Sequence, residues 1–263
     1  MGTGTVAHEE RTTTVARAVE SPAFEADAAV VAAMQPSPPA LPTYRTAPPP
    51  SLDLLYEARR GTDLGQARIT WRIDAEGHYA LEMQGSGAPG APAALTPHWT
   101  SRGRLDADGV APERFAVSRR GRERHAANFR RDVGIVSFAG PAATWPLAAG
   151  AQDRLSWMVQ LAAVFQADPK LAVAGTQVSM MVVGAHGDAG PWTFTVQRQM
   201  VVEGPGGVAV PAWQLHRDSA HAHDPQVQVW LAPSLHHLPV RLRLTLPRSG
   251  ESTEMHLRAL QTP

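Results

Sequence analysis

The chain has 263 residues, with 24 lysines and arginines against 24 aspartates and glutamates, and therefore no formal net charge. This balance argues against a nucleic-acid partner or an anionic membrane surface as partner. The sequence has no cysteine, which excludes disulfides, thiolate metal sites and cysteine nucleophiles. No apolar run is long enough to span a bilayer, and the first residues lack the basic start and apolar core of a secretion signal.

Residues 1–50 differ in composition from the rest of the chain. The stretch Ser37–Ser51 reads SPPALPTYRTAPPPS, and proline at this density favours an extended, solvated chain that cannot build a core. We therefore predict a disordered or loosely attached arm and Pro-rich linker over residues 1–50. A single β-rich domain is expected over residues 51–263.

Alternating apolar and polar residues predict strands through most of that domain. Ile69, Trp71 and Ile73 alternate with Thr70 and Arg72, and a period of two gives a strand one buried and one exposed face. Gly, Asp and Pro mark the turns between such segments. The predicted strands are 67–73, 79–83, 99–105, 113–119, 122–130, 133–138, 176–184, 191–202, 207–217, 226–232, 239–247 and 253–259.

The segment Asp153–Gln166, DRLSWMVQLAAVFQ, breaks this pattern. Its apolar residues fall three or four positions apart, which is helical spacing. Asp153 is the predicted N-cap, because its carboxylate can accept free N–H groups of the first turn. So apolar a helix must be covered, and the sheet is the expected cover. Trp157 and Phe165 are then candidate contacts for a ligand in the concave face of the sheet.

Residues 227–246, VQVWLAPSLHHLPVRLRLTL, give the clearest strand pair. Val229 and its apolar neighbours point one way, whereas Trp230 points to the polar side. Trp230 is therefore a candidate ligand or partner contact, either exposed or packed under the N-terminal arm. His236 and His237 lie in the turn of this pair and are predicted to be surface residues.

A dozen strands with one helix exceed an ordinary two-layer arrangement. We predict a mainly β fold, in which one large curved antiparallel sheet, an open or half β-barrel, wraps around the helix at about residues 153–166.

Several short motifs occur in a defined order along the domain. They are Leu55-Tyr56-Glu57 at the first strand, Ser101-Arg102-Gly103, Gly109–Phe115 (GVAPERF), Ala126–Phe138 (AANFRRDVGIVSF), Ala151–Ser156 (AQDRLS), Val229–Pro233 (VWLAP) and Leu238–Arg241 (LPVR). In this order and spacing the chain resembles the bacterial family known as domain of unknown function 3108 (DUF3108), over about residues 52–260.

The resemblance implies a protein of the cell envelope that faces the periplasm, with an open β-barrel similar in outline to lipoprotein carriers. Many such proteins carry an N-terminal membrane anchor before a Pro-rich linker. This sequence shows the linker without an anchor, so membrane association is expected only through an anchor that the chain does not contain. The family offers no catalytic signature and no cofactor.

Three functions follow as hypotheses. The first is a non-enzymatic envelope protein that binds an apolar or lipid-like molecule in its concave face. The second is an envelope scaffold that binds a protein partner through a sheet edge or the Trp230 face. The third is a histidine-dependent metal-binding protein or hydrolase, for which no Gly-x-Ser-x-Gly elbow or phosphate loop is present.

The third hypothesis depends on the segment LHRDSAHAHDP. His216, His221, His223 and Asp224 could supply imidazole and carboxylate ligands to Zn²⁺ or Ni²⁺. A solvated loop between strands explains the same residues more simply, and no metal site is predicted.

A second polar cluster surrounds Glu123 and His125, which lie two apart and share a strand face. Six arginines lie nearby, at positions 119, 120, 122, 124, 130 and 131. A solvated basic strand face is the simpler interpretation, and a site for an anion or lipid headgroup is the alternative.

Overall fold

The computed structural model describes residues 1–2, 41–87, 98–220 and 224–263. The chain divides into two units, Met1–Pro36 and Ser37–Pro263. Residues 3–40, on which most of the predicted arm falls, lie outside the described residues, as do His221 and His223.

The second unit is a β-rich domain, and its described residues form one sheet of 15 strands. The strands are β1 (Leu52–Arg60), β2 (Asp63–Ile73), β3 (His78–Gly87), β4 (His98–Asp106), β5 (Gly109–Arg119), β6 (Arg122–Arg130), β7 (Ile135–Ala139), β8 (Thr144–Pro146), β9 (Gln152–Asp153), β10 (Gln177–Val183), β11 (Ala189–Glu203), β12 (Ala209–Arg217), β13 (Gln226–Ala232), β14 (Leu238–Thr245) and β15 (Ser252–Gln261). The 3-10 helices are η2 (Pro169–Leu171), η3 (Pro205–Gly207) and η4 (Pro233–Leu235).

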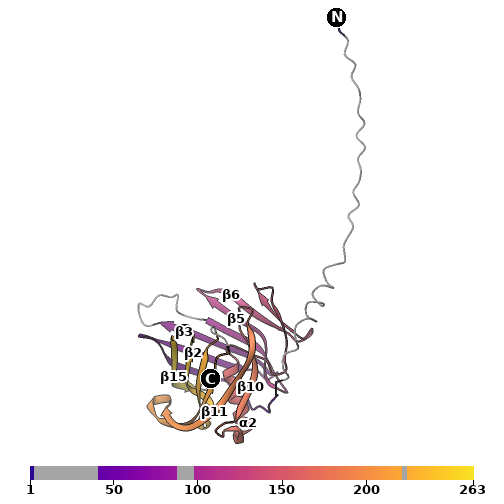
Figure 1. The fold of residues 1–263 in the computed structure, drawn as a ribbon. Helices are drawn as coiled ribbons and strands as arrows, with labels where there is room; N and C mark the ends of the chain where they lie inside the picture. The colour runs from indigo at the N-terminus through magenta and orange to yellow at the C-terminus, as the bar shows by residue number, and fades with distance from the viewer. Residues whose placement is uncertain (3–40, 88–97, 221–223) are drawn as a thin grey trace. The chain divides into compact units, whose positions relative to one another are not determined.

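The strand order is β8-β7-β6-β5-β4-β3-β2-β1-β15-β14-β13-β12-β11-β10-β9. The sheet therefore consists of two antiparallel meanders, β1–β8 and β10–β15, joined where the first strand pairs with the last, and β9 lies at the edge beside β10. Every neighbouring pair is antiparallel except β9 and β10. Figure 1 shows the early strands β2–β6 and the late strands β10–β15 as the two halves of this sheet.

The sheet curls until its two edges come close together. The edge strands β8 and β9 are consecutive in the chain, and six residue steps separate Pro146 from Gln152. An extended chain of that length covers at most about 20 Å. The Gln152 side-chain amide donates to the carbonyl of Val110 in β5 at 2.6 Å, which ties the β9 edge to the other half. Strands β8 and β9 do not pair with each other, so the barrel stays open.

Apolar side chains on one face of each strand form the core. Leu52 of β1 lies opposite Trp71 of β2, and Trp71 lies opposite Leu81 of β3. Leu54 and Ile69 form the next such pair, and all five residues are buried. The alternation in the sequence is thus the alternation between core and solvent, and the prediction of a large curved sheet with one helix is confirmed for the described residues.

The helix α2 (Trp157–Ala167) covers the concave side of the sheet and contacts β5, β9 and β14. Every residue from Trp157 to Phe165 is buried, as expected for a helix that is apolar all round. Trp157 stacks on Phe194 of β11 with ring centroids 5.1 Å apart. Trp157 and Phe165, predicted as ligand contacts, are therefore part of the packed core.

The predicted start of the helix is wrong. The helix begins at Trp157, and its N-cap is Ser156 rather than Asp153. The Asp153 carboxylate does accept backbone N–H groups, from Leu155 at 2.8 Å and Ser156 at 2.7 Å. These bonds close a turn before the helix, which is why the sequence pattern resembled a cap.

Residues 41–50, the end of the predicted linker, are in contact with the domain. The N–H of Ala47 donates to the carbonyl of Ala163 in α2 at 2.9 Å. The indole N–H of Trp71 donates to the carbonyl of Pro49 at 3.0 Å, and Tyr44 packs against the core. Among the described residues, no helix is long and apolar enough to cross a membrane.

Candidate anion-binding site

The hairpin between β5 and β6 brings four arginines together. Arg119 pairs with Arg122 across the two strands, so Arg120 and Gly121 alone form the turn. Their φ angles are 53° and 70°, and positive φ at both positions is the requirement of a type I′ turn. Glycine adopts this conformation freely, whereas a left-handed residue with a side chain costs about 1–2 kcal/mol. Arginine is thus an unfavourable choice for position 120.

The charges of this hairpin are also unfavourable in the unliganded protein. Arg119 and Arg122 are directly opposite, and like charges in that relation destabilise a strand pair. Within the described residues, no acidic side chain pairs with Arg119, Arg120, Arg122 or Arg124. Glu123, the acid among them, pairs instead with Arg114 at 2.5 Å. Both the left-handed backbone of Arg120 and the facing charges of Arg119 and Arg122 lower the stability of the hairpin. We infer that these arginines serve a function other than stabilising the fold.

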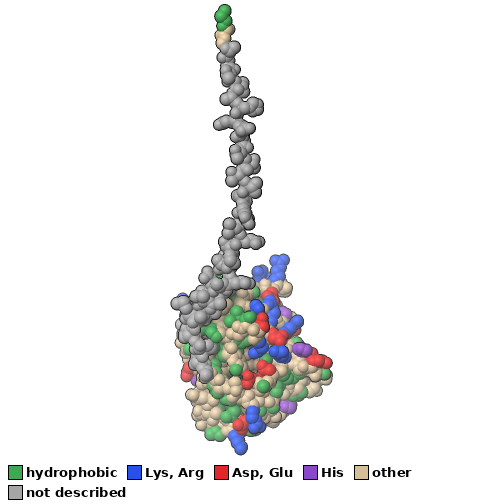
Figure 2. Space-filling view, turned by 90° about the vertical axis from the view of Figure 1, so that its right-hand side faces the viewer, with side chains coloured by type: hydrophobic (Ala, Val, Ile, Leu, Met, Phe, Trp, Pro, Cys, Tyr) green, Lys and Arg blue, Asp and Glu red, His purple; other side chains and the backbone are tan. Residues whose placement is uncertain are grey.

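Three of these arginines line a pocket of about 520 Å³, which we call the arginine pocket. Its lining residues are Val117, Arg119, Arg120, Arg124, His125 and His186. Figure 2 shows Lys and Arg side chains at the upper edge of one face of the domain, and further basic side chains interspersed with acidic and histidine side chains below them. Guanidinium groups bind carboxylates and phosphates through paired N–H donors, so the pocket suits an anion.

The two histidines of the arginine pocket come from opposite halves of the sheet. His125 lies on β6, and His186 lies in the loop between β10 and β11. Their ring centroids are 4.1 Å apart. Burial lowers the pKa of His186, as do His125 and Arg154, while Asp188 acts in the opposite direction. His186 is therefore more often uncharged near neutral pH than an isolated histidine, and the uncharged state allows this close contact.

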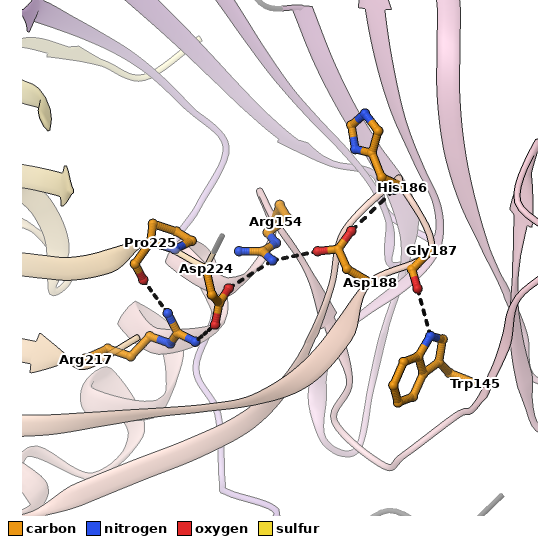
Figure 3. Close-up of polar contacts among 8 residues, drawn as sticks. All are labelled: Trp145, Arg154, His186, Gly187, Asp188, Arg217, Asp224 and Pro225. Atoms are coloured by element: carbon orange, nitrogen blue, oxygen red, sulfur yellow. Dashed lines mark hydrogen bonds and ion pairs between the residues drawn. The ribbon is translucent and has the colours of Figure 1, made fainter. Parts of the chain in front are cut away.

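The loop that carries His186 is fixed on both sides. The indole N–H of Trp145 donates to the carbonyl of Gly187 at 3.0 Å. Arg154 donates to the carboxylate of Asp188 at 2.6 Å, and the N–H of Gly184 donates to the Asp188 carbonyl at 2.8 Å. The Trp145 contact holds this loop of the late half against β8 of the early half, and the other two contacts fix it within the late half (Figure 3).

Arg154 also belongs to a chain of ion pairs that leads away from the pocket. It lies 3.1 Å from Asp224, which in turn pairs with Arg217 (Figure 3). Both guanidiniums lie over the ring of Trp192, at 4.7 Å for Arg154 and 4.2 Å for Arg217. Arg217 is only 2% exposed, and burial lowers its pKa although Asp224 opposes the shift. Asp224 thus holds a buried cation in place.

Asp224, a member of the predicted histidine cluster, thus pairs with two arginines. His216 hydrogen-bonds to Asp218 at 2.8 Å, and it alternates along β12 with Arg217, which places the two on opposite faces. His221 and His223 lie outside the described residues. Among the residues that the structure describes, no group of three His, Asp or Glu side chains could hold a metal ion.

A buried polar cluster surrounds Asp153. The hydroxyl of Ser101 donates to the Asp153 carboxylate at 2.5 Å, and the hydroxyls of Tyr79 and Ser101 lie 2.8 Å apart. Serine beside a carboxylate can serve nucleophilic catalysis, but Ser101 and Asp153 are both fully buried. Burial raises the pKa of Asp153 to about 6, although its hydrogen bonds from Ser101 and the backbone oppose the shift. The cluster links β4 to the turn that precedes α2.

Of the two predictions for Trp230, exposure is wrong, and packing under the N-terminal arm falls mostly on residues outside the described ones. Its side chain is on the outer side of the sheet as expected, but it is only 4% exposed. The guanidinium of Arg241 lies 4.6 Å from the centre of its ring, and its indole N–H points to the Met200 sulfur at 3.2 Å. Long side chains of neighbouring strands cover it. Trp230 is therefore not an exposed aromatic surface for a partner.

His237 also differs from its predicted place at the turn surface. It is 5% exposed, and its ring hydrogen-bonds to Gln166 near the end of α2 at 2.9 Å. Burial lowers its pKa, as does His236, so the ring is held uncharged beside the helix.

The fold and the pocket together define an open β-barrel protein with a basic pocket beside its opening. Residues 54–258 match the family described as "Protein of unknown function (DUF3108)". The chain belongs to the DUF3108 family. No curated protein matches it.

Solved structures with a similar fold include a β-barrel-like protein of family DUF1849 from Brucella abortus. It aligns with 84% of this chain and 99% of its own, at 13% identity and a TM-score of 0.51, which shows a shared fold. A protein with a YmcC-like fold from Bacteroides fragilis aligns over 84% of this chain and 100% of its own at 10% identity, with a TM-score of 0.35. The MucA/MucB complex of Pseudomonas aeruginosa aligns over 80% of this chain and 51% of its own at 13% identity, with a TM-score of 0.32.

Proposed function

We propose that this chain is a non-enzymatic ligand-binding protein of the bacterial cell envelope, and that its ligand presents an anionic group to the arginine pocket. The location follows the expectation attached to the family. The observation that carries the proposal is the set of three guanidiniums, on Arg119, Arg120 and Arg124, that line one pocket without an acidic partner among the described residues.

The fold favours the arginine pocket, rather than the concave face of the sheet, as the ligand site. Helix α2 occupies the concave side, and Leu161, Val164 and Phe165 have no exposed surface. A ligand there would have to displace a packed helix, at the cost of the apolar burial that stabilises the domain. The arginine pocket is open to solvent and needs no such rearrangement.

Arg120→Asn gives the sharpest test, because the substitution should change binding and stability in opposite directions. Loss of one charged hydrogen bond costs about 1.5–3 kcal/mol, so the affinity for inorganic pyrophosphate should fall about tenfold or more in isothermal titration calorimetry. Asparagine tolerates the left-handed conformation of residue 120, so urea unfolding should show a gain of about 1 kcal/mol.

Arg122→Gln is the matched control for that variant. It removes the same charge from the same hairpin, but Arg122 does not line the pocket, so pyrophosphate affinity should fall by about threefold at most through the long-range field. Equal losses for Arg120→Asn and Arg122→Gln would mean a diffuse basic surface and would contradict a specific site. No binding of pyrophosphate to the wild type would reject the proposal outright.

The anion could come from a soluble molecule or from a lipid headgroup, and both present the same chemistry to the arginines. Cosedimentation with vesicles of phosphatidylglycerol, compared with phosphatidylcholine, separates the two sources. A headgroup ligand predicts selective cosedimentation that pyrophosphate displaces and Arg120→Asn weakens. A soluble ligand predicts pyrophosphate binding without cosedimentation.

Affinity for sulfate should rise as the pH falls from 7 to 5. The lowered pKa of His186 leaves its ring uncharged near neutral pH, and protonation at lower pH adds a positive charge to the pocket lining. Sulfate is the suitable probe because its own charge is constant over this range. The rise should be smaller in His186→Gln, and an identical pH profile in that variant would exclude His186 from the site.

A further inference from the structure

A second pocket adjoins the arginine pocket. It has a volume of about 540 Å³, and His186 lines both pockets. Its uncharged lining comes from Ala189, Gly190, Pro191 and Trp192 at the start of β11 together with Ala220. We call it the Trp192 pocket. The two spaces are therefore neighbours that share the His186 side chain.

The ionic side chains of the Trp192 pocket compensate each other. Arg154 pairs with Asp188 at 2.6 Å and with Asp224 at 3.1 Å, and Arg217 also pairs with Asp224 (Figure 3). Two guanidiniums thus meet two carboxylates. The charges of the arginine pocket have no such compensation among the described residues. An anionic group is therefore favoured in the arginine pocket, and an uncharged group in the Trp192 pocket.

The size and lining of the two spaces narrow the ligand further. Each lies within the range of about 300–1,000 Å³ that is typical of small-molecule sites. Ala189 and Pro191 present mainly carbon atoms, whereas Trp192 adds little surface because it is only 2% exposed. Apolar surface gains free energy by leaving water. A molecule with one anionic end and one aliphatic end matches a basic pocket that lies next to an uncharged one.

We propose that the ligand is a single-chain anionic amphiphile, with its charged end in the arginine pocket and its aliphatic chain in the Trp192 pocket beyond His186. This inference rests on the proposed function, because it assumes that the arginine pocket holds an anion. It adds the chemical class of the ligand and a second subsite, which takes the uncharged end of the ligand.

The test compares ethyl sulfate with octyl sulfate, kept below the concentration at which it forms micelles, in isothermal titration calorimetry. Each methylene that leaves water is worth about 0.8 kcal/mol, or about fourfold in affinity. Burial of even two or three methylenes should make octyl sulfate bind at least tenfold more tightly than ethyl sulfate.

Gly190→Leu probes the second subsite alone. A Cβ atom on Gly190 would meet no heavy atom within 4 Å, and Gly190 is not among the residues with positive φ. The variant should therefore fold normally, and its leucine side chain should occupy the part of the pocket beside position 190. This should weaken the preference for octyl sulfate while leaving ethyl sulfate binding unchanged. Gly190→Ala is the matched control and should keep most of the preference.

The outcomes separate the two proposals. Equal affinity for ethyl and octyl sulfate would overturn the amphiphile inference and leave the anion site standing. A preference for octyl sulfate that is unchanged in Gly190→Leu would also overturn it, since the chain would then lie elsewhere. Failure of both sulfates to bind, or equal binding of uncharged octyl glucoside, would overturn the anion site itself.

Discussion

Replacing Asp153 with alanine is expected to destabilise the protein by about 3–5 kcal/mol, since three buried donors would lose their acceptor. These are the Ser101 hydroxyl and the N–H groups of Leu155 and Ser156. Urea unfolding followed by fluorescence measures the change. Asp106→Ala is the matched control, because Asp106 also accepts a backbone N–H, from Asp108, but in an exposed turn. That variant should lose less than about 1 kcal/mol.

The same carboxyl predicts a pH dependence of stability. Burial raises the pKa of Asp153 to about 6, above the value of about 3.9 that an unfolded chain gives. The folded state then holds the proton more tightly than the unfolded state. Its contribution is complete below about pH 4 and is lost as the pH rises through about 6, by about 3 kcal/mol in total.

Asp153→Asn isolates that contribution, because the amide cannot titrate while the rest of the chain is unchanged. The difference in unfolding free energy between the wild type and this variant should change between pH 4 and 7, in favour of the variant at the higher pH. A constant difference across that range would show that the pKa of Asp153 is not raised in the folded protein.

Replacing Phe165 with alanine should be comparably severe, with a loss of about 3–5 kcal/mol. The Phe165 side chain has no exposed surface, and its ring centroid lies 6.3 Å from that of His237. Val173→Ala is the control, since Val173 is 57% exposed, and it should change stability by less than about 0.5 kcal/mol.

The Phe165→Ala variant also tests whether the ligand binds at the concave face or in the arginine pocket. If Phe165 belongs to a filled core, Phe165→Ala should lower the unfolding free energy while the pyrophosphate affinity of the remaining folded protein stays the same. A small loss of stability together with weaker pyrophosphate binding would instead indicate that the ligand binds at the concave face.

Local patterns in the sequence are sufficient to predict most of this fold. Alternation identifies strands such as Gln226–Ala232 within one or two residues, because the pleat alone decides which side chains face the core. The short edge strands β8 and β9 have too few residues to show a period, and both were missed. The helix was found, but its start depends on turn bonds of Asp153 that resemble a cap.

The sequence likewise predicts only part of the candidate site. The arginines of the β5–β6 hairpin are close in sequence, so their clustering was visible. His186 joins them only because the sheet curls, and no local signal connects it to position 125. Trp230 shows the converse error. Its face of the strand was predicted correctly, but its cover by Arg241 depends on a neighbouring strand and not on alternation.

The pairing of β1 with β15 has a consequence for how the chain reaches its native state. β15 completes the sheet by inserting between β1 and β14. Until it does so, both of those strands present unpaired N–H and C=O groups, which are templates for pairing with other chains. The pairing of β1 with β15 joins strands from opposite ends of the domain, and such long-range pairing is slow. The chain is therefore expected to be most prone to aggregate while β15 is still unpaired.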